Sequence, residues 1–177
     1  MSGEASAPST IRRLARPSEA ELEALALVLI DCVEGGASVS FMHPLSLEKA
    51  VAFWRRVASE VARGARVLLV AEDASGIVGT VQLLLAQPEN QPHRAEISKM
   101  LVHRRARRQG VGAQLMRAAE DAARAAKKSL LVLDTASGDA ERLYARLGWT
   151  LVGIIPGYAL WPEGGLCSTS VFYRRLA

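Results

Sequence analysis

The segment that most constrains the fold of this chain is 95–112, where a strand pattern runs into a helix pattern. Residues 95–103 alternate with a period of two, so Ile97 and Leu101 are expected on the same side of one strand. From residue 109 to about 127 the apolar residues recur at spacings of three and four, which predicts a helix. The helix therefore begins beside the end of the strand.

Further elements flank this segment on both sides. Helices are predicted at 18–32, 46–61 and 139–147, and strands at 11–14, 66–72, 77–86, 130–133, 150–155 and 166–173. The turn at 73–76 joins two of these strands as an antiparallel hairpin. Antiparallel strands followed by alternating helices and strands predict an α/β fold, with a mixed sheet and helices on both of its faces.

Length and composition favour one soluble domain. At 177 residues the chain is long enough for one substantial core and too short for two ordinary ones. Residues 1–10 are small and polar and predict a disordered leader, which leaves 11–177 as the domain. No apolar run approaches the roughly 20 residues that cross a bilayer, and the start has no secretory signal. We therefore expect a cytoplasmic protein without a membrane partner, with Cys32 and Cys167 reduced.

The junction between the strand and the helix has the chemistry of an anion site. Gly110 and Gly112 stand in the first helical turn, where backbone N–H groups can approach an anion without interference from side chains. The helix dipole favours negative charge at the same point. Arginines, which bind phosphates through paired hydrogen bonds, precede the turn at Arg104, Arg105, Arg107 and Arg108. A polyanionic ligand is the predicted partner.

Two other phosphate-binding classes fit the junction less well. A dinucleotide site partly agrees with Gly110, Gly112 and Asp134, but it requires a third glycine where this chain has Leu115. The short chain after Asp134 is also too small for the remaining strands of such a sheet. Nucleic-acid binding lacks support because the net charge is only +4 and no aromatic residues are interleaved with the arginines. No nucleic-acid partner is expected.

Two blocks of residues resemble the GNAT superfamily of N-acetyltransferases. The blocks are Leu101, Val102 and His103 followed by Arg107, Arg108, Gln109, Gly110, Val111 and Gly112, and then Ala140, Leu143, Tyr144, Gly148 and Trp149. The likeness extends from about Ile11 to the end, and it is closest to the branch that includes the tabtoxin-resistance acetyltransferase. Residues 95–100, 133–135 and 156–158 carry that closer likeness. The resemblance implies a mostly antiparallel, twisted sheet of six or seven strands, with acetyl-CoA as the acetyl donor.

The resemblance also implies which residues bind acetyl-CoA. They are Met100, Leu101, Val102, Arg107, Arg108, Gln109, Gly110, Val111, Gly112, Ala113, Ser137 and Tyr144. Many members have Asn where this chain has Ser137, whose shorter side chain can still hydrogen-bond to the pantetheine arm. The family strand has a bulge that frees a backbone N–H for the oxyanion, near Leu101 or Val102.

Acetyl transfer to an amine needs a proton acceptor, an oxyanion donor and a proton for the leaving thiolate. An alkylamine is mostly protonated at neutral pH because its pKa is about 10, so a carboxylate base is expected. The candidates are Asp134 and Glu96, the positions at which the related branch has acidic residues. Asp134 is favoured because a carboxylate at the end of an apolar strand is costly unless it faces a cleft or a cap. Tyr144 is the candidate acid for the thiolate.

The acceptor is expected to lie under two loops that contain Phe41 and Tyr158, the candidate substrate contacts. The resemblance favours a small-molecule amine, such as an amino-acid-like toxin or antibiotic, and thus a role in resistance. The three histidines are too scattered for a metal site, so none is expected. The sequence leaves open a protein acceptor, a larger acyl-CoA as donor, an acetyl-CoA sensor or interaction module, and a homodimer.

Overall fold

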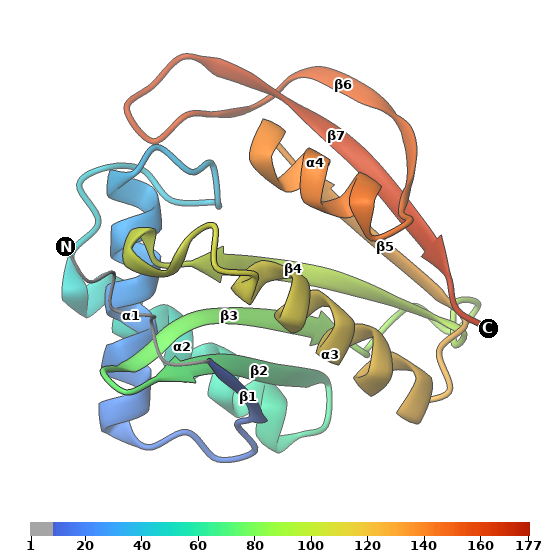
Figure 1. Ribbon diagram of the computed structural model, residues 1–177, viewed down its shortest axis with the longest axis horizontal. Coiled ribbons are helices and arrows are strands. Elements are labelled where there is room, and N and C mark those ends of the chain that lie inside the picture. Colours follow the sequence, from blue (N-terminus) through green and yellow to red (C-terminus); the bar gives the residue numbers. More distant parts are fainter. Residues whose placement is uncertain (1–8) are drawn as a thin grey trace, which may run out of the picture.

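The computed structural model describes residues 9–177, in which a twisted sheet lies between two layers of helices (Figure 1). The strands are β1 (Thr10–Arg13), β2 (Arg66–Asp73), β3 (Gly76–Leu84), β4 (Arg94–Val102), β5 (Leu130–Thr135), β6 (Thr150–Leu160) and β7 (Leu166–Arg175). Their order is β1-β2-β3-β4-β5-β7-β6, and only β4 and β5 pair in parallel. The predicted mixed, mostly antiparallel sheet is confirmed, with seven strands.

The helices divide between the two faces of this sheet. They are α1 (Glu19–Glu34), α2 (Leu47–Ala62), α3 (Val111–Ala125) and α4 (Gly138–Arg146), with a short 3-10 turn, η1 (Arg104–Ala106). One hydrophobic cluster packs α3 and α4 against the sheet around Leu115 and Leu131, and a second packs α1 and α2 around Leu29 and Trp54. Burial of these apolar side chains from both faces stabilises the sheet in the middle.

Serine caps start the first two helices as their sequence indicates. The Ser18 hydroxyl accepts a hydrogen bond from the Glu21 N–H, and the Glu21 carboxylate accepts one from the Ser18 N–H, which completes a capping box at α1. The predicted cap Ser46 accepts a hydrogen bond from the Lys49 N–H at α2. Of the expected leader, residues 1–8 lie outside the described residues, and Thr10 already belongs to β1.

Two expectations about the strands are wrong. Ile97 and Leu101 lie on opposite faces of the sheet, since Ile97 packs with α3 and Leu101 packs with α1 and α2. A shift of register in β4 opposite Val81 inserts one extra residue and reverses the faces beyond it. β6 also continues beyond the expected end at residue 155 to Leu160, because pairing with β7 resumes at Ala159 after an irregularity.

Asp31 anchors the loop after β4 to α1. Its carboxylate accepts hydrogen bonds of 2.8 Å from both the backbone N–H and the Nε of Arg104. Burial alone would raise the pKa of Asp31, but these two bonds and the nearby charges of His103 and Arg104 outweigh it and lower the pKa. The ionised carboxylate therefore holds η1, which leads into α3, against α1.

We expect Asp31→Asn to lower the free energy of unfolding at pH 7 by about 1–2 kcal/mol, since a bond to a charged group is weakened. Because the folded-state pKa is depressed, this stabilisation is present above the unfolded-state value of about 3.9 and is lost as the pH falls through the folded-state pKa. Urea unfolding followed by circular dichroism at pH 7 and pH 3 should give a smaller difference at pH 3. Glu34→Gln, which removes an exposed 3.6 Å contact to Arg104, is the control and should change little. Equal differences at both pH values would contradict the assignment.

Candidate active site

The site is built around the point where β4 and β5 part. The two strands pair only at Arg94–Leu130, Ala95–Leu131 and Glu96–Val132, although β4 continues to Val102. β5 remains paired with β7 as far as Thr135. Within residues 9–177, the edge of β4 that faces β5 therefore has no partner strand after Glu96. Backbone N–H and C=O groups along such an edge are available to a ligand.

A β-bulge lies on the unpaired part of β4. Ser98 pairs with Gln82 and Leu101 pairs with Thr80, so Lys99 and Met100 together face one residue of β3. Lys99 has a φ of 49°, in the left-handed region that non-glycine residues rarely occupy. The bulge implied by the resemblance is present, slightly earlier than Leu101. The assignment of an oxyanion donor to Leu101 or Val102 stays a prediction.

Both candidate bases line one cavity beside this point. The cavity has a volume of about 200 Å³ and is lined by Glu96, Val132, Leu133, Asp134, Ile155, Tyr158, Thr169 and Val171. The buried Thr169 hydroxyl donates a 2.8 Å hydrogen bond to Oδ2 of Asp134. The predicted residues Glu96, Asp134 and Tyr158 are thus brought together. Thr169 was missed, because a contact between β5 and β7 has no local signal in the sequence.

Tyr144 of α4 does not line this cavity. The side chain is 4% exposed and packs against Trp149 and Phe172, with ring centroids 6.0 Å and 5.7 Å away. Burial raises the pKa of the Tyr144 phenol, and the negative charge of Asp134 raises it further. The phenol is therefore protonated at neutral pH, as a proton donor must be. Its role as the acid stays a prediction.

The N-terminus of α3 has the predicted properties of an anion cradle. Its N-cap Gly110 has a φ of 80° and provides no capping side chain, so the N–H groups of the first turn receive no side-chain cap. Arg108, also at positive φ, is exposed beside this turn. The Arg107 Nε donates to the Val102 carbonyl at 3.1 Å, and the Gln109 side chain donates to the Arg105 carbonyl. These contacts stabilise the loop in its curved form.

Two of the four arginines are engaged elsewhere, contrary to expectation. Arg104 binds Asp31, and Arg105 pairs with Asp73 in the β2–β3 turn at 2.7 Å. These acidic partners lie far away in the sequence, so the run of arginines alone did not reveal them. Arg107 and Arg108 make no ion pair within residues 9–177, and they are the arginines left for a ligand.

Close packing brings the cradle against the rest of the site. A Cβ atom at Gly112 would lie 3.0 Å from Cδ2 of Leu143 and 3.7 Å from Sδ of Met100, so glycine permits α3 to approach α4 and β4. Val111 and Leu101 have buried side chains, and only their backbones can meet a ligand. Ala113 is half-buried in the same turn.

Ser137 serves a structural purpose in addition to its predicted one. It is the N-cap of α4, and its hydroxyl accepts a 3.4 Å hydrogen bond from the Ala140 N–H. The residue is exposed, so its lone pairs and hydroxyl proton are also accessible to a ligand. A contact with the pantetheine arm stays a prediction.

Phe41 does not line the cavity with Tyr158. It lies in the loop between α1 and α2, where its ring meets the Phe53 ring edge-on at 5.2 Å. The Lys99 ammonium lies 5.9 Å from the centroid of the same Phe53 ring and donates a hydrogen bond to the Ser40 hydroxyl. The loop thus meets the bulge of β4. The sequence pattern missed Lys99 because it stands among ordinary strand residues.

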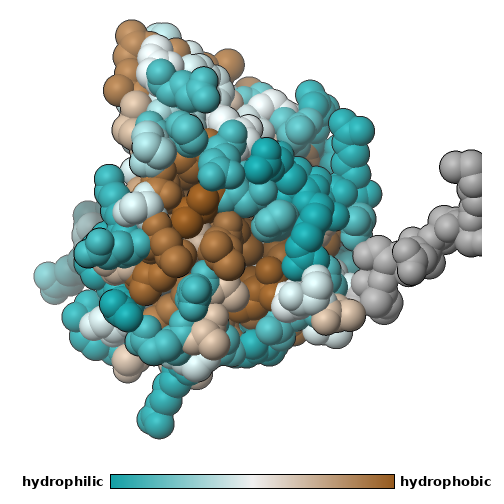
Figure 2. Space-filling view, turned by 90° about the vertical axis from the view of Figure 1, so that its left-hand side faces the viewer, coloured by the Kyte–Doolittle hydropathy of each residue, from teal (hydrophilic) through white to brown (hydrophobic). Residues whose placement is uncertain are grey.

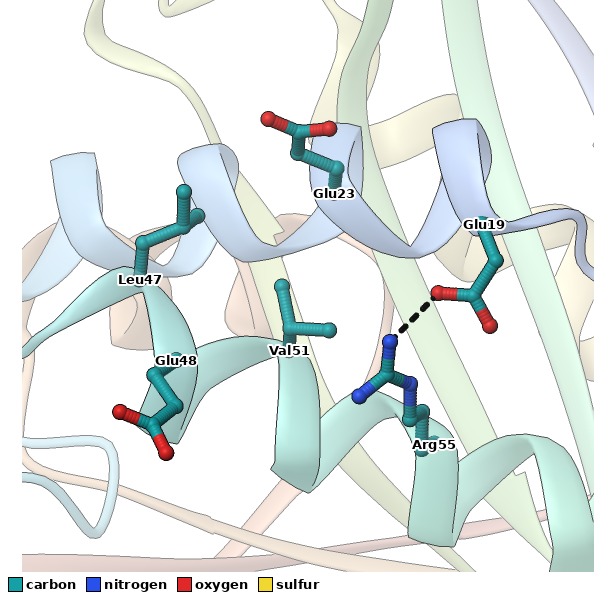
Figure 3. Close-up of a pocket in the computed structure, with 6 residues that line it drawn as sticks. All are labelled: Glu19, Glu23, Leu47, Glu48, Val51 and Arg55. Carbon is teal, nitrogen blue, oxygen red and sulfur yellow. Dashed lines mark hydrogen bonds and ion pairs between the residues drawn. The ribbon is translucent and has the colours of Figure 1, made fainter.

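A larger hollow of about 410 Å³ lies between α1 and α2 (Figure 3). Its lining residues are Glu19, Glu23, Leu47, Glu48, Val51 and Arg55. In Figure 3 Arg55 reaches across from α2 to Glu19 of α1, a pair at 2.7 Å that ties the helices together. None of the predicted site residues line it, so size alone does not identify the site.

The described part of the chain offers neither a membrane span nor a metal cluster. No helix among residues 9–177 combines the length and apolarity needed to cross a membrane. The same residues contain no group of three or more His, Cys, Asp or Glu side chains placed to hold a metal ion. Cys32 and Cys167 are both free and buried.

Part of this chain matches a known family model, and the chain as a whole shares its fold with known structures. Residues 64–151 match the family model of the acetyltransferase (GNAT) domain. The yncA protein of Salmonella typhimurium, solved with its cofactor acetyl-CoA, is 19% identical with a TM-score of 0.78, covering 97% of this chain and 95% of that one. A phosphinothricin acetyltransferase of Sinorhizobium meliloti, in complex with AcCoA, is 19% identical with a TM-score of 0.78 and coverages of 96% and 89%.

A third solved structure differs in its acceptor. The ribosomal-protein-alanine N-acetyltransferase of Brucella melitensis is 24% identical with a TM-score of 0.78, covering 94% of this chain and 99% of that one. Similar folds therefore serve a small molecule in one case and a protein in another, so the fold does not identify the acceptor. Residues 64–151, which include the parting strands and the cradle, match the acetyltransferase (GNAT) domain model, and the chain as a whole has the fold of GNAT acetyltransferases.

Proposed function

We propose that this protein transfers the acetyl group of acetyl-CoA to the amine of a small molecule, with Asp134 or Glu96 as the proton acceptor. One observation carries the proposal: both carboxylates line a single cavity where β4 and β5 part. The cavity lies on the sheet face opposite α3 and α4, because Leu131 and Leu133, which alternate with Val132 and Asp134, pack toward those helices. An amine can therefore enter from one face and the donor from the other.

The residues present fit acetyl-CoA as the donor. The uncapped first turn of α3 suits the pyrophosphate, with Arg107 and Arg108 beside it. The free edge of β4 from Met100 to Val102 suits the amide groups of the pantetheine arm. When bound, acetyl-CoA would supply a thioester. Its carbonyl carbon would be open to attack by the amine nitrogen, with the coenzyme A sulfur as the leaving thiolate.

The side chains supply the proton transfers that this reaction needs. The Thr169 hydroxyl donates to Oδ2 of Asp134, which orients the carboxylate and leaves Oδ1 free to accept a proton from the amine. Glu96 lines the same cavity and can accept the proton directly or through water. The protonated phenol of Tyr144 can donate a proton to the thiolate.

A small acceptor fits the cavity better than a folded protein does. Its volume of about 200 Å³ is below the range of roughly 300–1,000 Å³ typical of drug-sized ligands. Tyr158 lines the rim, and Phe41 lies on the neighbouring loop, so both are proposed acceptor contacts. Membership of the tabtoxin-resistance branch and a role in resistance belong to this same proposal. A protein amine is the alternative acceptor.

Acetyl-CoA binding tests the first half of the proposal. We expect wild-type protein to bind acetyl-CoA in isothermal titration calorimetry, and Arg108→Ala to raise the Kd about 10-fold because a charge-assisted hydrogen bond to phosphate is lost. Arg105→Ala is the matched control, since Arg105 pairs with Asp73, and should change the Kd less than about twofold. No binding by the wild type would refute the proposal, and equal effects of the two variants would refute the cradle assignment.

Turnover tests the second half. Thiol release with a panel of small amines should fall about 10²- to 10³-fold in kcat/KM for Asp134→Asn or Glu96→Gln, whichever removes the base, and about 10²-fold for Tyr144→Phe. Asp139→Asn removes an exposed carboxylate of α4 and should leave the rate unchanged. Acetyl-CoA binding without thiol release for any amine or peptide would instead favour a sensor or interaction module.

A second copy of this chain is proposed to cover β6. This edge strand exposes apolar side chains on both faces, at Leu151, Val152, Ile154, Ile155, Tyr158 and Leu160. Figure 2 shows apolar side chains gathered on one side of the molecule, including its top, where the β6–β7 hairpin lies. A long apolar edge strand pairs readily with another chain, and a copy of the same strand offers matching backbone groups and apolar surface.

Light scattering after size-exclusion chromatography tests this dimer. We expect wild-type protein to elute as a dimer and Ile154→Lys to shift it toward the 19.0 kDa monomer, since a charge would be buried at the interface. Leu27→Lys is the matched control because Leu27 is 53% exposed on α1, away from β6. A monomeric wild type, or the same shift in both variants, would contradict the proposal.

A further inference from the structure

Helix α1 is more apolar than a helix on the surface of a protein normally is. Residues 24–30 are all apolar, and such a run covers about two turns and every side of the helix. The sheet and α2 bury one side, whereas Leu27 on the outer side remains 53% exposed. A helix that is apolar on all sides is normally buried on all sides. Within residues 9–177, the outer side of α1 therefore lacks a covering element.

This outer side borders the hollow of about 410 Å³ between α1 and α2, which we call the α1–α2 groove (Figure 3). The two helices run antiparallel, with the Glu19–Arg55 pair at one end of the groove and Leu47 at the other. Leu27 lies two turns beyond Glu19 on the same face of α1, and Leu47 lies two turns before Arg55. Both leucines therefore belong to the end away from the ion pair, where Leu47 is 41% exposed.

Carboxylates border the same groove. Glu23 of α1 and Glu48 of α2 are exposed, and neither forms an ion pair within residues 9–177. Because Glu19 and Arg55 neutralise each other, the groove has a net charge of −2, whereas the whole chain has +4. Figure 2 faces the side of the molecule on which α1 lies in Figure 1, and it shows apolar side chains bordered by hydrophilic ones. Such a surface is complementary to a partner that is both apolar and cationic.

We propose that the α1–α2 groove docks a basic amphipathic helix of another protein. A groove between two antiparallel helices has the shape that a third helix fills with side chains at spacings of three and four. Apolar side chains of the docked helix cover Leu27, Leu47 and Val51. Its lysines or arginines pair with Glu23 and Glu48, which have no other counter-ion. The same two carboxylates disfavour an anionic membrane surface as the covering partner.

The groove is separate from the proposed acceptor cavity. The two hollows share no lining residue, because the groove is formed by α1 and α2 and the cavity by β4, β5, β6 and β7. Docking therefore does not depend on acetyl transfer or on the identity of the acceptor. Failure of either proposal leaves the other one standing.

Fluorescence anisotropy with a synthetic peptide tests the docking surface. The probe is a labelled helical peptide of about four turns, built of leucine and lysine with the leucines at spacings of three and four. We expect the wild-type chain to bind this peptide with a Kd of about 10 µM. One comparison peptide has glutamate in place of each lysine, and another has the same residues in scrambled order. Both should bind at least about 10-fold more weakly, since each lacks one half of the match.

Variants of exposed residues locate the binding without disturbing the fold. Leu27→Asn should raise the Kd about 10-fold because apolar burial is lost, and the double variant Glu23→Gln/Glu48→Gln should raise it about 5- to 10-fold because two ion pairs are lost. The matched controls are Leu166→Asn, which changes an exposed leucine of β7, and Glu89→Gln, which changes an exposed glutamate before β4. Both controls should change the Kd less than about twofold.

Other occupants of the groove give different results. Absence of binding by the wild type, or equal effects of the groove variants and the controls, would overturn the proposal. Displacement of the peptide by an equal concentration of spermidine would assign the groove to small cations instead of a helix. A lower mass of Leu27→Asn than of the wild type in light scattering would assign it to a second copy of this chain, and the proposal would be wrong.

Discussion

Three residue pairs join β4 to β5, and the rest of the site depends on the end of this short contact. Glu96 and Val132 form the last pair, after which β5 stays with β7 while β4 stays with β3. The bulge at Lys99 bends β4 at the same level, because an extra residue increases the local twist of a strand. The sheet cannot then remain continuous between the two strands. Its parting exposes the backbone edge of β4 and opens the cavity that holds both carboxylates.

The bulge also changes which face of the sheet each residue of β4 points to. Before it, alternation directs Ile97 toward α3, and beyond it Leu101 points toward α1 and α2 while Met100 packs near Gly112. The extra residue therefore places Met100 of β4 beside Gly112, at the start of α3, on one face of the sheet. On the other face it places Lys99 beside the Phe53 ring. The Asp31–Arg104 contact holds the loop that follows, which keeps the start of α3 in line with the open edge.

Local signals made the junction and most elements predictable from the sequence. Glycines in a first helical turn and serine caps act over a few residues, and their effects follow from the residue types themselves. The position of Glu96 and Asp134 in one cavity depends on the parallel pairing of β4 and β5. Long-range contacts were not predictable in this way. Nothing near Thr169 indicates that it binds Asp134, and nothing near Arg105 indicates Asp73.

The position of the bulge in β4 could not be predicted from the sequence either, for a different reason. Lysine has no preference for positive φ, so a lysine at this conformation has no signature in composition or periodicity. The same limit applies to β6, which was expected to end at residue 155, yet pairing with β7 resumes at Ala159 and Leu160. In β6 this irregularity includes Tyr158, whose side chain lines the cavity.

The irregular strand β6 connects acceptor binding with assembly. Ile155 and Tyr158 line the cavity from β6, the strand whose other apolar side chains have no partner in a single chain. A second copy on β6 would remove water from the rim, and a drier rim strengthens the interactions of Asp134 and Glu96 with an amine. Association of two chains would then strengthen acceptor binding by excluding water from the place where β4 and β5 part.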